Sequence, residues 1–160
     1  MTVRHPNADV IERFYSALQR RDAAGMADCY HRDIHFSDEA FTDLRGPKAG
    51  AMWRMLCERG KDLKVEFADV VADERSGRAH WEAWYTFSAT GRTVHNVIEA
   101  QFEFRDGKIV RHRDTFDFWR WSRQAFGPLG VMLGWTPFLK QRVRREAGRA
   151  LERFMQKRDA

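Results

Sequence analysis

The amino-acid sequence predicts a single α+β domain, in which a cone-shaped curved antiparallel sheet packs on three N-terminal helices and a C-terminal helical extension follows. Three observations carry this prediction. The chain has 160 residues, the length of one domain. Apolar residues recur with helical spacing up to about residue 60 and alternate with polar residues after it, as in strands. Helices followed by a run of strands are typical of α+β domains.

The predicted helices lie in the N-terminal part of the chain. The first covers residues 9–21, where apolar positions recur every three or four residues. A second, short helix covers residues 23–31. A third covers residues 46–60 and begins at Gly46-Pro47, because proline suits the first turn of a helix. Residues 34–38 alternate as a short strand between the second and third helices.

Four longer strands follow, over residues 63–72, 78–89, 93–105 and 108–119. Short turns at Ser76-Gly77, Thr90-Gly91 and Asp106-Gly107 would join them into an antiparallel meander.

The hairpin registers decide which face of the sheet points inward. A two-residue turn at residues 90–91 pairs Tyr85 with Asn96. A three-residue loop around Gly107 pairs Phe102 with Val110. One face then carries Trp81, Ala83, Tyr85, Phe87, Val94, Asn96, Ile98, Ala100, Phe102, Val110, His112, Asp114 and Phe116. A few polar groups in an apolar wall are typical of a ligand pocket.

Composition and charge exclude several classes of function. The net charge is +5, but residues 1–136 hold 20 basic and 20 acidic side chains, against 8 and 3 in residues 137–160. Equal numbers of basic and acidic side chains over residues 1–136 argue against a continuous positive surface that follows a nucleic-acid backbone, so we expect no nucleic-acid partner. No apolar stretch is long enough for a membrane span and no apolar segment opens the chain, so we expect a cytoplasmic protein.

Metals and cofactors are not expected either. The sequence has no HExxH motif, no Cys/His cluster and no glycine-rich phosphate-binding motif. Cys29 and Cys57 lack CxxC spacing, and we predict that both are reduced.

Asp114 and His112 are the strongest candidates for chemistry. They lie two residues apart on one strand, and so on one face at about 7 Å. Burial would bring both pKa values towards neutrality, where a general acid or base works. The alternative is a buried hydrogen-bond network with a purely structural role. Asp38 is a candidate second carboxylate, or else a turn residue that ends its strand.

Other inward residues would bind a substrate. Asn96 and Tyr85 would position a substrate oxygen, because a buried amide is seldom placed for packing alone. Tyr15 and Tyr30 are further possible hydroxyl donors, although most buried tyrosines fill core. The apolar candidates for substrate contact are Trp81, Ile98, Phe102 and Phe116.

The order of elements, the DG hairpin followed by IVRHRDTFDF, and the opening helix followed by CYHRDIHFSDEAF resemble the nuclear transport factor 2-like superfamily. The resemblance covers roughly residues 8–120 and implies its cone-shaped α+β fold. Members include ketosteroid isomerase, SnoaL-like polyketide cyclases, limonene-epoxide hydrolase and scaffolding or transport domains without catalysis. Because proteins with this fold have many different functions, the resemblance implies the fold more strongly than the reaction.

The resemblance also implies roles for particular residues. Asp38 falls where ketosteroid isomerase has its general base, while Phe14 stands where that family has an oxyanion-hole tyrosine. Asp114 falls on one of the two catalytic aspartates of limonene-epoxide hydrolase, and Ala83 stands at or beside the other. SnoaL-like cyclases depend on an aspartate at the position of Asp114, so the resemblance to them is favoured.

We therefore predict a SnoaL-like enzyme that isomerises, cyclises or hydrates a small hydrophobic carbonyl compound by cofactor-free acid/base chemistry. The alternative is a non-catalytic ligand-binding or scaffold dimer of the same fold. The resemblance implies a homodimer formed through the outer face of the sheet, which carries His80, Glu82, Trp84, Val97, Ile109, Arg111 and Arg113.

The tail is assigned separately, with the family-like domain at residues 1–121 and the extension at residues 122–160. An apolar glycine-rich loop over residues 127–135 precedes a basic amphipathic helix. Three roles remain open for that helix: packing on its own domain or its dimer mate, a lid over the pocket, and contact with an anionic membrane surface. We expect membrane contact least, because most amphipathic helices bury their apolar stripe internally.

Overall fold

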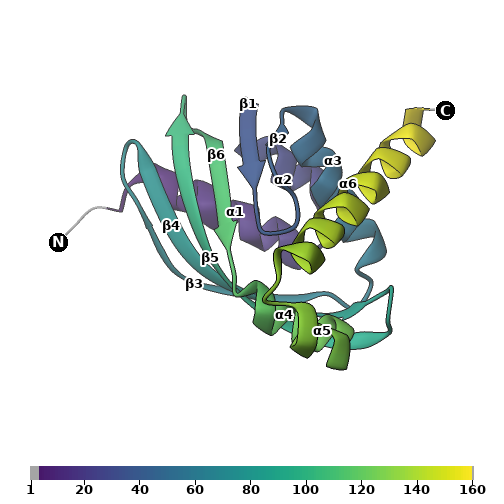
Figure 1. Ribbon diagram of the computed structural model, residues 1–160. Coiled ribbons are helices and arrows are strands. Elements are labelled where there is room, and N and C mark those ends of the chain that lie inside the picture. The colour runs from purple at the N-terminus through teal and green to yellow at the C-terminus, as the bar shows by residue number, and fades with distance from the viewer. Residues whose placement is uncertain (1–3, 160) are drawn as a thin grey trace.

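The computed structural model describes residues 4–159 and shows a six-stranded curved sheet (Figure 1). Three helices precede or interrupt the strands and pack on the inner side of the sheet, and three more follow the last strand. The helices are α1 (Pro6–Gln19), α2 (Ala23–Cys29), α3 (Pro47–Arg59), α4 (Phe118–Phe126), α5 (Pro128–Leu133) and α6 (Pro137–Asp159). The strands are β1 (Tyr30–Ser37), β2 (Leu44–Arg45), β3 (Lys64–Ala72), β4 (Ser76–Phe87), β5 (Arg92–Arg105) and β6 (Lys108–Thr115). The predicted fold class is confirmed.

The strand order in the sheet is β2-β1-β6-β5-β4-β3. The four long strands form the predicted antiparallel meander. The sheet is nevertheless mixed, because β1 lies parallel to β6. The two-residue strand β2 was not predicted, since so short an element leaves no periodicity to detect.

Both hairpin registers differ from the prediction by two residues. Tyr85 lies opposite Val94, because residues 88–91 form a four-residue loop. Phe102 lies opposite His112, because a two-residue turn with positive φ at both central residues is followed by a bulge. A shift of two preserves the face on which each side chain points. The inward face is therefore as predicted apart from one difference at the start of β6. Ile109, predicted to lie on the outer face, is fully buried, and Val110, predicted to lie on the inner face, is only partly buried.

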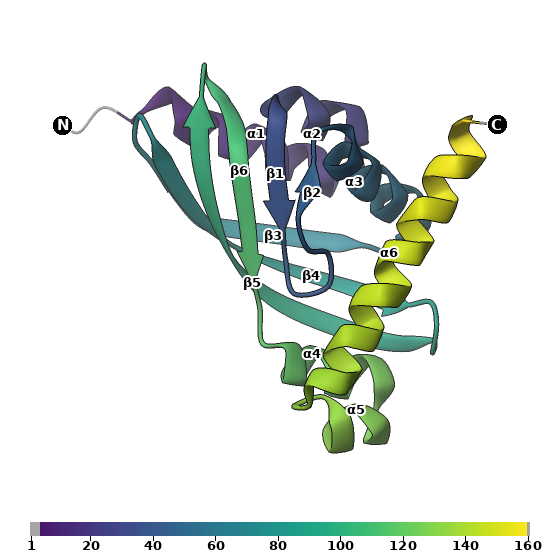
Figure 2. The same cartoon turned by 45° about the horizontal axis from the view of Figure 1, so that its top comes forward.

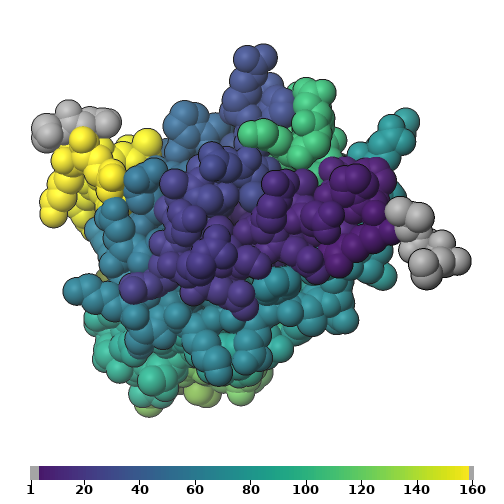
Figure 3. Space-filling view, turned by 180° about the vertical axis from the view of Figure 1, so that it is seen from behind, coloured from purple at the N-terminus to yellow at the C-terminus, as the bar shows by residue number. Residues whose placement is uncertain are grey.

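Helices α1, α2 and α3 pack on the concave side of the sheet and close one end of the cone (Figure 2). Pro6 begins α1, and its apolar stripe, including Ile11, Phe14 and Leu18, is fully buried. In the view from behind, the N-terminal helices (purple to blue) lie side by side across the middle and upper part of the molecule, and strand residues (teal) remain visible below them (Figure 3). The main core lies between this layer and strands β1, β4, β5 and β6.

The segment after β6 differs most from the sequence prediction. The last strand ends at Thr115 rather than near residue 119, and α4 begins where β6 leaves the edge of β5 uncovered. On this uncovered side of β5, the Gln124 side chain of α4 accepts a hydrogen bond from the His95 N–H and donates one to the His95 C=O. Helix α4 thus protects a sheet edge that would otherwise be open.

Residues 127–135, predicted to be a loop, contain the helix α5. Two glycines permit its close approach to α4. A Cβ atom at Gly130 would lie 1.9 Å from the carbonyl oxygen of Ser122, and one at Gly134 would lie 1.9 Å from the Ser122 hydroxyl. The sequence pattern suggested chain flexibility at these glycines, whereas in the structure they serve helix packing.

Helix α6 runs from the α4–α5 end of the molecule to α3 and crosses the open side of the curved sheet (Figures 1 and 2). Its apolar stripe is buried at Leu139, Leu151 and Phe154. Leu139 packs beside α4, and the other two join the main core. The tail helix therefore packs on its own domain. Of the described helices, none is both long and apolar enough to cross a membrane.

Candidate functional site

A chain of hydrogen bonds crosses the interior of the cone from α3 to β4. Trp53 Nε1 donates to the Tyr30 hydroxyl at 2.9 Å, and that hydroxyl lies 2.8 Å from His112 Nδ1. His112 Nε2 lies 2.9 Å from Asp114 Oδ1. Trp81 Nε1 donates to the same oxygen at 3.3 Å.

One tautomer of His112 satisfies all of these contacts. If Nε2 carries the proton, it donates to the Asp114 carboxylate and leaves Nδ1 to accept from the Tyr30 hydroxyl. The imidazole is fully buried and touches the rings of Phe102 and Phe36 at centroid distances of 4.5 and 5.0 Å. It is thus fixed in position and orients the carboxylate beside it.

Asp114 keeps one oxygen free. Both donors reach Oδ1, and Oδ2 accepts no hydrogen bond from the described residues. Because Oδ2 has no partner and yet is not one of the fully enclosed unpartnered atoms, it keeps some accessible surface. The side chain as a whole is only 3% exposed. A carboxylate oriented through one oxygen and open at the other can accept a proton there.

Asp38 directly follows β1 and forms the predicted turn. Its Oδ1 accepts from the backbone N–H of Ala40 at 2.7 Å and of Phe41 at 2.6 Å, as in a polar turn. Burial, and to a lesser extent the negative charge of Asp114, raise the pKa of this carboxyl to about 7, although the backbone hydrogen bonds act to lower it. The two carboxylates predicted from sequence therefore interact.

Three polar side chains were predicted to bind a substrate, and their hydrogen bonding differs. Burial raises the pKa of Tyr85 to about 12, and its hydroxyl accepts from Trp121 Nε1 at 2.8 Å, which leaves its proton to donate. Asn96 is 7% exposed, and its side chain makes no hydrogen bond to the described residues. The Tyr15 hydroxyl is fully enclosed and has no partner among them.

The Tyr15 hydroxyl lies in the same electrostatic environment as the carboxylates. Burial raises the pKa of Tyr15 well above its ordinary value, and the charge of Asp114 adds to the effect. Its ring packs on Trp81 at a centroid distance of 5.5 Å. A buried hydroxyl without an acceptor costs free energy. The Tyr15 hydroxyl is therefore a buried donor whose hydrogen bond is not formed within the described residues.

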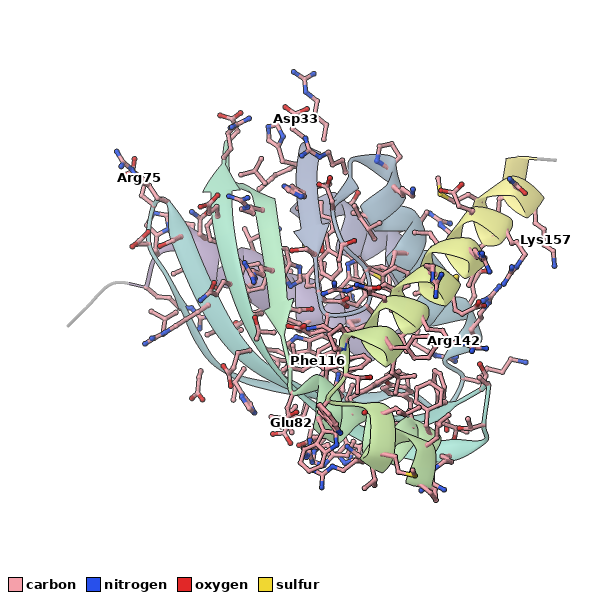
Figure 4. All side chains as sticks on the ribbon, in the orientation of Figure 1. Asp33, Arg75, Glu82, Phe116, Arg142 and Lys157 are labelled. Atoms are coloured by element: carbon pink, nitrogen blue, oxygen red, sulfur yellow. The ribbon has the colours of Figure 1, made fainter. Side chains whose placement is uncertain are left out.

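The predicted apolar contacts occupy two zones. Trp81, Ile98 and Phe102 belong to the main core, where Trp81 also holds Asp114. Phe116, labelled near the centre of Figure 4, is partly buried and packs against both the main core and the smaller cluster around α4. Phe116 thus connects the two clusters.

The sequence did not reveal the part played by Trp53, or that of Tyr30 beyond a possible hydroxyl donor. Trp53 lies on α3, and only the packing of that helix brings its indole to Tyr30. Tyr30 begins β1, whose parallel pairing with β6 sets it near His112. No spacing in the sequence reports a contact between segments so far apart.

Helix α6 contacts the loop that holds Asp38. Lys140 Nζ lies 2.6 Å from Glu39 Oε2, and Arg144 Nε donates to the Glu39 backbone oxygen at 3.0 Å. Two surface depressions, of about 640 and 470 Å³, lie elsewhere, at the start of β5 beside α4 and along α1 and α2. Within residues 4–159, no three His, Cys, Asp or Glu side chains are grouped to bind a metal ion.

Comparison with known proteins gives a family match. The model of the SnoaL-like domain matches residues 11–112. No curated protein matches the chain.

Solved structures share the fold at low identity. An LEH-like epoxide hydrolase from M. tuberculosis has 20% identity and a TM-score of 0.64, covering 80% of this chain and 95% of that one. A candidate polyketide cyclase from Xanthomonas campestris has 19% identity and a TM-score of 0.63, covering 76% and 98%. A nuclear transport factor 2-like protein of unknown function from Burkholderia pseudomallei has 14% identity and a TM-score of 0.65, with the same coverage.

Proposed function

Because this chain belongs to the SnoaL-like domain family, we propose that it is an enzyme that performs cofactor-free acid/base chemistry on a small hydrophobic carbonyl compound. The reaction would be an isomerisation, a cyclisation or a hydration. The observation that carries the proposal is the pairing of two interacting carboxylates with different surroundings, Asp114 on β6 and Asp38 at the end of β1. Two titratable groups held in different environments can take the roles of acid and base.

Asp114 acts as the base. Its Oδ1 is held by His112 and Trp81, so its free Oδ2 points at a fixed place and removes a proton from the carbon next to the substrate carbonyl, or from water in a hydration. His112 is fully buried and does not touch the substrate, so it is a positioning residue.

Asp38 acts as the proton donor. With a pKa of about 7 it is largely protonated in mildly acidic solution and about half protonated at neutrality. In an isomerisation, one proton leaves the substrate to Asp114 and one returns from Asp38, so the substrate keeps its composition. The Tyr85 and Asn96 side chains would donate hydrogen bonds to the carbonyl oxygen as negative charge develops on it.

The solved structures of this fold guide the choice of compounds rather than the reaction. One is an LEH-like epoxide hydrolase and another a candidate polyketide cyclase, both at identities that show the fold alone. They motivate the choice of compounds to test: cyclic enones, epoxides and aromatic polyketide-like ketones.

The test is proton exchange in D2O, which detects proton abstraction even when no product accumulates. We expect wild type to introduce deuterium next to the carbonyl of at least one compound, as measured by mass spectrometry. Asp114→Asn keeps an acceptor for His112 and Trp81 but cannot take the proton, so we expect exchange to fall by roughly 10²- to 10⁴-fold. Equal exchange by the two proteins would refute the assignment of Asp114.

A second candidate function is ligand binding without turnover. It is favoured by the completeness of the network from Trp53 to Asp114, in which each donor has a partner and His112 has no exposed surface. A compound that stabilises wild type and Asp114→Asn alike, and is recovered from both without deuterium, would identify a carrier.

We also propose a homodimer formed through the outer face of the sheet. On that face the Trp84 ring stacks on His95 with 4.5 Å between centroids, and His80 bridges Glu82 and Glu99. Light scattering of wild type and Trp84→Glu tests the proposal: the variant is expected to be monomeric, and an unchanged mass would exclude this face.

A further inference from the structure

A cationic depression lies where the turn between β4 and β5 meets α4. Three arginines line it, Arg92, Arg120 and Arg123, together with Gly91, Thr93 and Gln124. None of the three arginines forms an ion pair with a described residue. The depression therefore gathers positive charge that the described part of the chain leaves uncompensated.

The Arg123 side chain forms no hydrogen bond with the described residues. Its guanidinium lies 4.2 Å from the ring centroid of Trp119, and its Nε atom is enclosed, which leaves its terminal N–H groups to reach an outside partner. Arg92 and Arg120 each spend one N–H on a backbone carbonyl, those of Gln124 and His95. Their remaining donors are free to bind an anionic oxygen.

An exposed apolar surface adjoins this depression. The Arg92 guanidinium lies against Gly127, at the junction of α4 and α5, and Trp119 donates to the Val131 carbonyl across those helices. The large apolar side chains exposed on this end of the molecule are Trp119, Leu129, Val131, Met132, Trp135 and Phe138. Trp135 is 72% and Met132 68% exposed. We call these six residues the apolar end.

The charge of the surrounding segment has a single sign. Residues 118–145 contain no acidic side chain. They contain the basic residues Arg120, Arg123, Lys140, Arg142, Arg144 and Arg145. Figure 4 shows Arg142 on the part of α6 next to the apolar end. Apolar side chains that project among cations are typical of surfaces that enter the headgroup region of an anionic bilayer.

We propose that the apolar end and the cationic depression together dock this protein on the surface of an anionic phospholipid membrane. The three arginines bind headgroup phosphates, while Trp135, Met132 and their neighbours enter the acyl boundary. Docking uses the α4–α5 end rather than the apolar stripe of α6, which is buried. It is independent of the carboxylate chemistry proposed above.

The membrane is favoured over a small free anion because the depression is open and continues into six exposed apolar side chains, which a phosphate ion would not cover. It is favoured over nucleic acid because the chain has no continuous basic track.

The test is co-sedimentation of the full chain with vesicles of phosphatidylcholine, alone or mixed with phosphatidylglycerol. We expect binding to the mixed vesicles only, and weaker binding as salt is raised. Each arginine near the surface is worth about fivefold in affinity, so R120Q/R123Q should bind at least tenfold more weakly. M132S/W135S should also bind more weakly, because its apolar anchors are lost.

Controls for charge and apolarity lie at other sites. R75Q/R78Q removes two exposed arginines at the far end of the sheet, where Figure 4 shows Arg75, and Val71→Ser removes an exposed apolar residue of β3. Both should bind the mixed vesicles like wild type. Melting curves of all variants verify their folding.

Three results would overturn the proposal. The first is no binding to mixed vesicles. The second is stabilisation by inorganic phosphate together with vesicle binding that M132S/W135S leaves unchanged, which would indicate a small-anion site. The third is a loss of self-association in M132S/W135S without any vesicle binding by wild type, which would assign the apolar end to a second copy of the chain.

Discussion

The buried tyrosines show how residues of one type come to differ in role. Tyr30 accepts from Trp53 and donates to His112, so its hydroxyl has two partners. Tyr15 is equally enclosed, but its hydroxyl has none among the described residues. The difference lies in their neighbours, because both side chains fill core with their rings.

This difference predicts effects of different size for the same substitution. Tyr30→Phe leaves Trp53 Nε1 and His112 Nδ1 without partners, and we expect it to lower the free energy of unfolding by about 2–4 kcal/mol. Tyr15→Phe removes an unsatisfied hydroxyl and should cost less than about 1 kcal/mol. Urea denaturation measures both. A Tyr15→Phe loss as large as that of Tyr30→Phe would contradict the assigned network.

The raised pKa of Asp38 predicts a dependence of stability on pH. In the folded protein this carboxyl keeps its proton up to about pH 7, while in the unfolded chain it loses it near its ordinary value. The group's contribution to stability is therefore complete in acid and is lost as pH rises through about 7, by up to about 4 kcal/mol.

Asp38→Asn cannot titrate and should lack this loss. The difference in free energy of unfolding between wild type and Asp38→Asn, measured from about pH 4 to 8, is expected to move in favour of the variant as pH rises. A difference independent of pH would mean that Asp38 is an ordinary exposed carboxylate.

At this scale the sequence could place His112 and Asp114 together in the interior but could not predict their hydrogen-bond partners. Residues two apart on a strand lie on the same face in any register, so it could be predicted that His112 and Asp114 lie together. The indole of Trp53 and the hydroxyl of Tyr30 reach the pair only through helix packing and a parallel strand pair. Local sequence encodes neither.

At the scale of elements, the hairpin of α4 and α5 depends on close backbone approach. Gly130→Ala would place a Cβ atom 1.9 Å from the Ser122 backbone oxygen, so the two helices must move apart. We expect a loss of about 1–3 kcal/mol, as for overpacked core positions.

Gly148→Ala is the matched control, since nothing lies within 4 Å of a Cβ atom there and the position is in the interior of α6. Its higher helix propensity should stabilise the protein by roughly 0.5–1 kcal/mol. Thermal melting distinguishes the two. Similar melting temperatures for both variants would contradict the tight packing of α4 on α5.

Elements with a clear period were predictable and those without one were not. The amphipathic helices α1 and α6 and the alternating strands β3 to β6 carry their pattern in the sequence. Helix α5 contains Gly130 and is followed by Gly134, both packed closely against α4, so the segment looks like a loop in the sequence. The hairpin register shifted by two because bulges and longer turns depend on backbone conformation at single residues.

At the scale of the whole molecule, α6 closes the open side of the sheet over the carboxylate site. Its contacts with the loop after β1 run through Glu39, the neighbour of Asp38. Helix α6 thus packs on its own domain and contacts the loop that holds Asp38.

This arrangement predicts that Lys140→Met loosens α6 without unfolding the domain. The ion pair with Glu39 is partly buried, and its loss should cost about 1 kcal/mol or less. Amide exchange in the first turns of α6 should nevertheless become faster, while exchange in β5 stays unchanged. Lys157→Met, near the exposed end of α6, is the control. Identical exchange in the two variants would contradict the role of Glu39.

The most direct test of the paired carboxylates is a carbon-13 NMR titration of Asp38 in wild type and in Asp114→Asn. The structure predicts a pKa of about 7 in wild type and a lower value in the variant, because the charge of Asp114 is then absent. An ordinary aspartate pKa near 4 in wild type, or a pKa that does not respond to Asp114→Asn, would contradict the interaction on which the proposed chemistry depends.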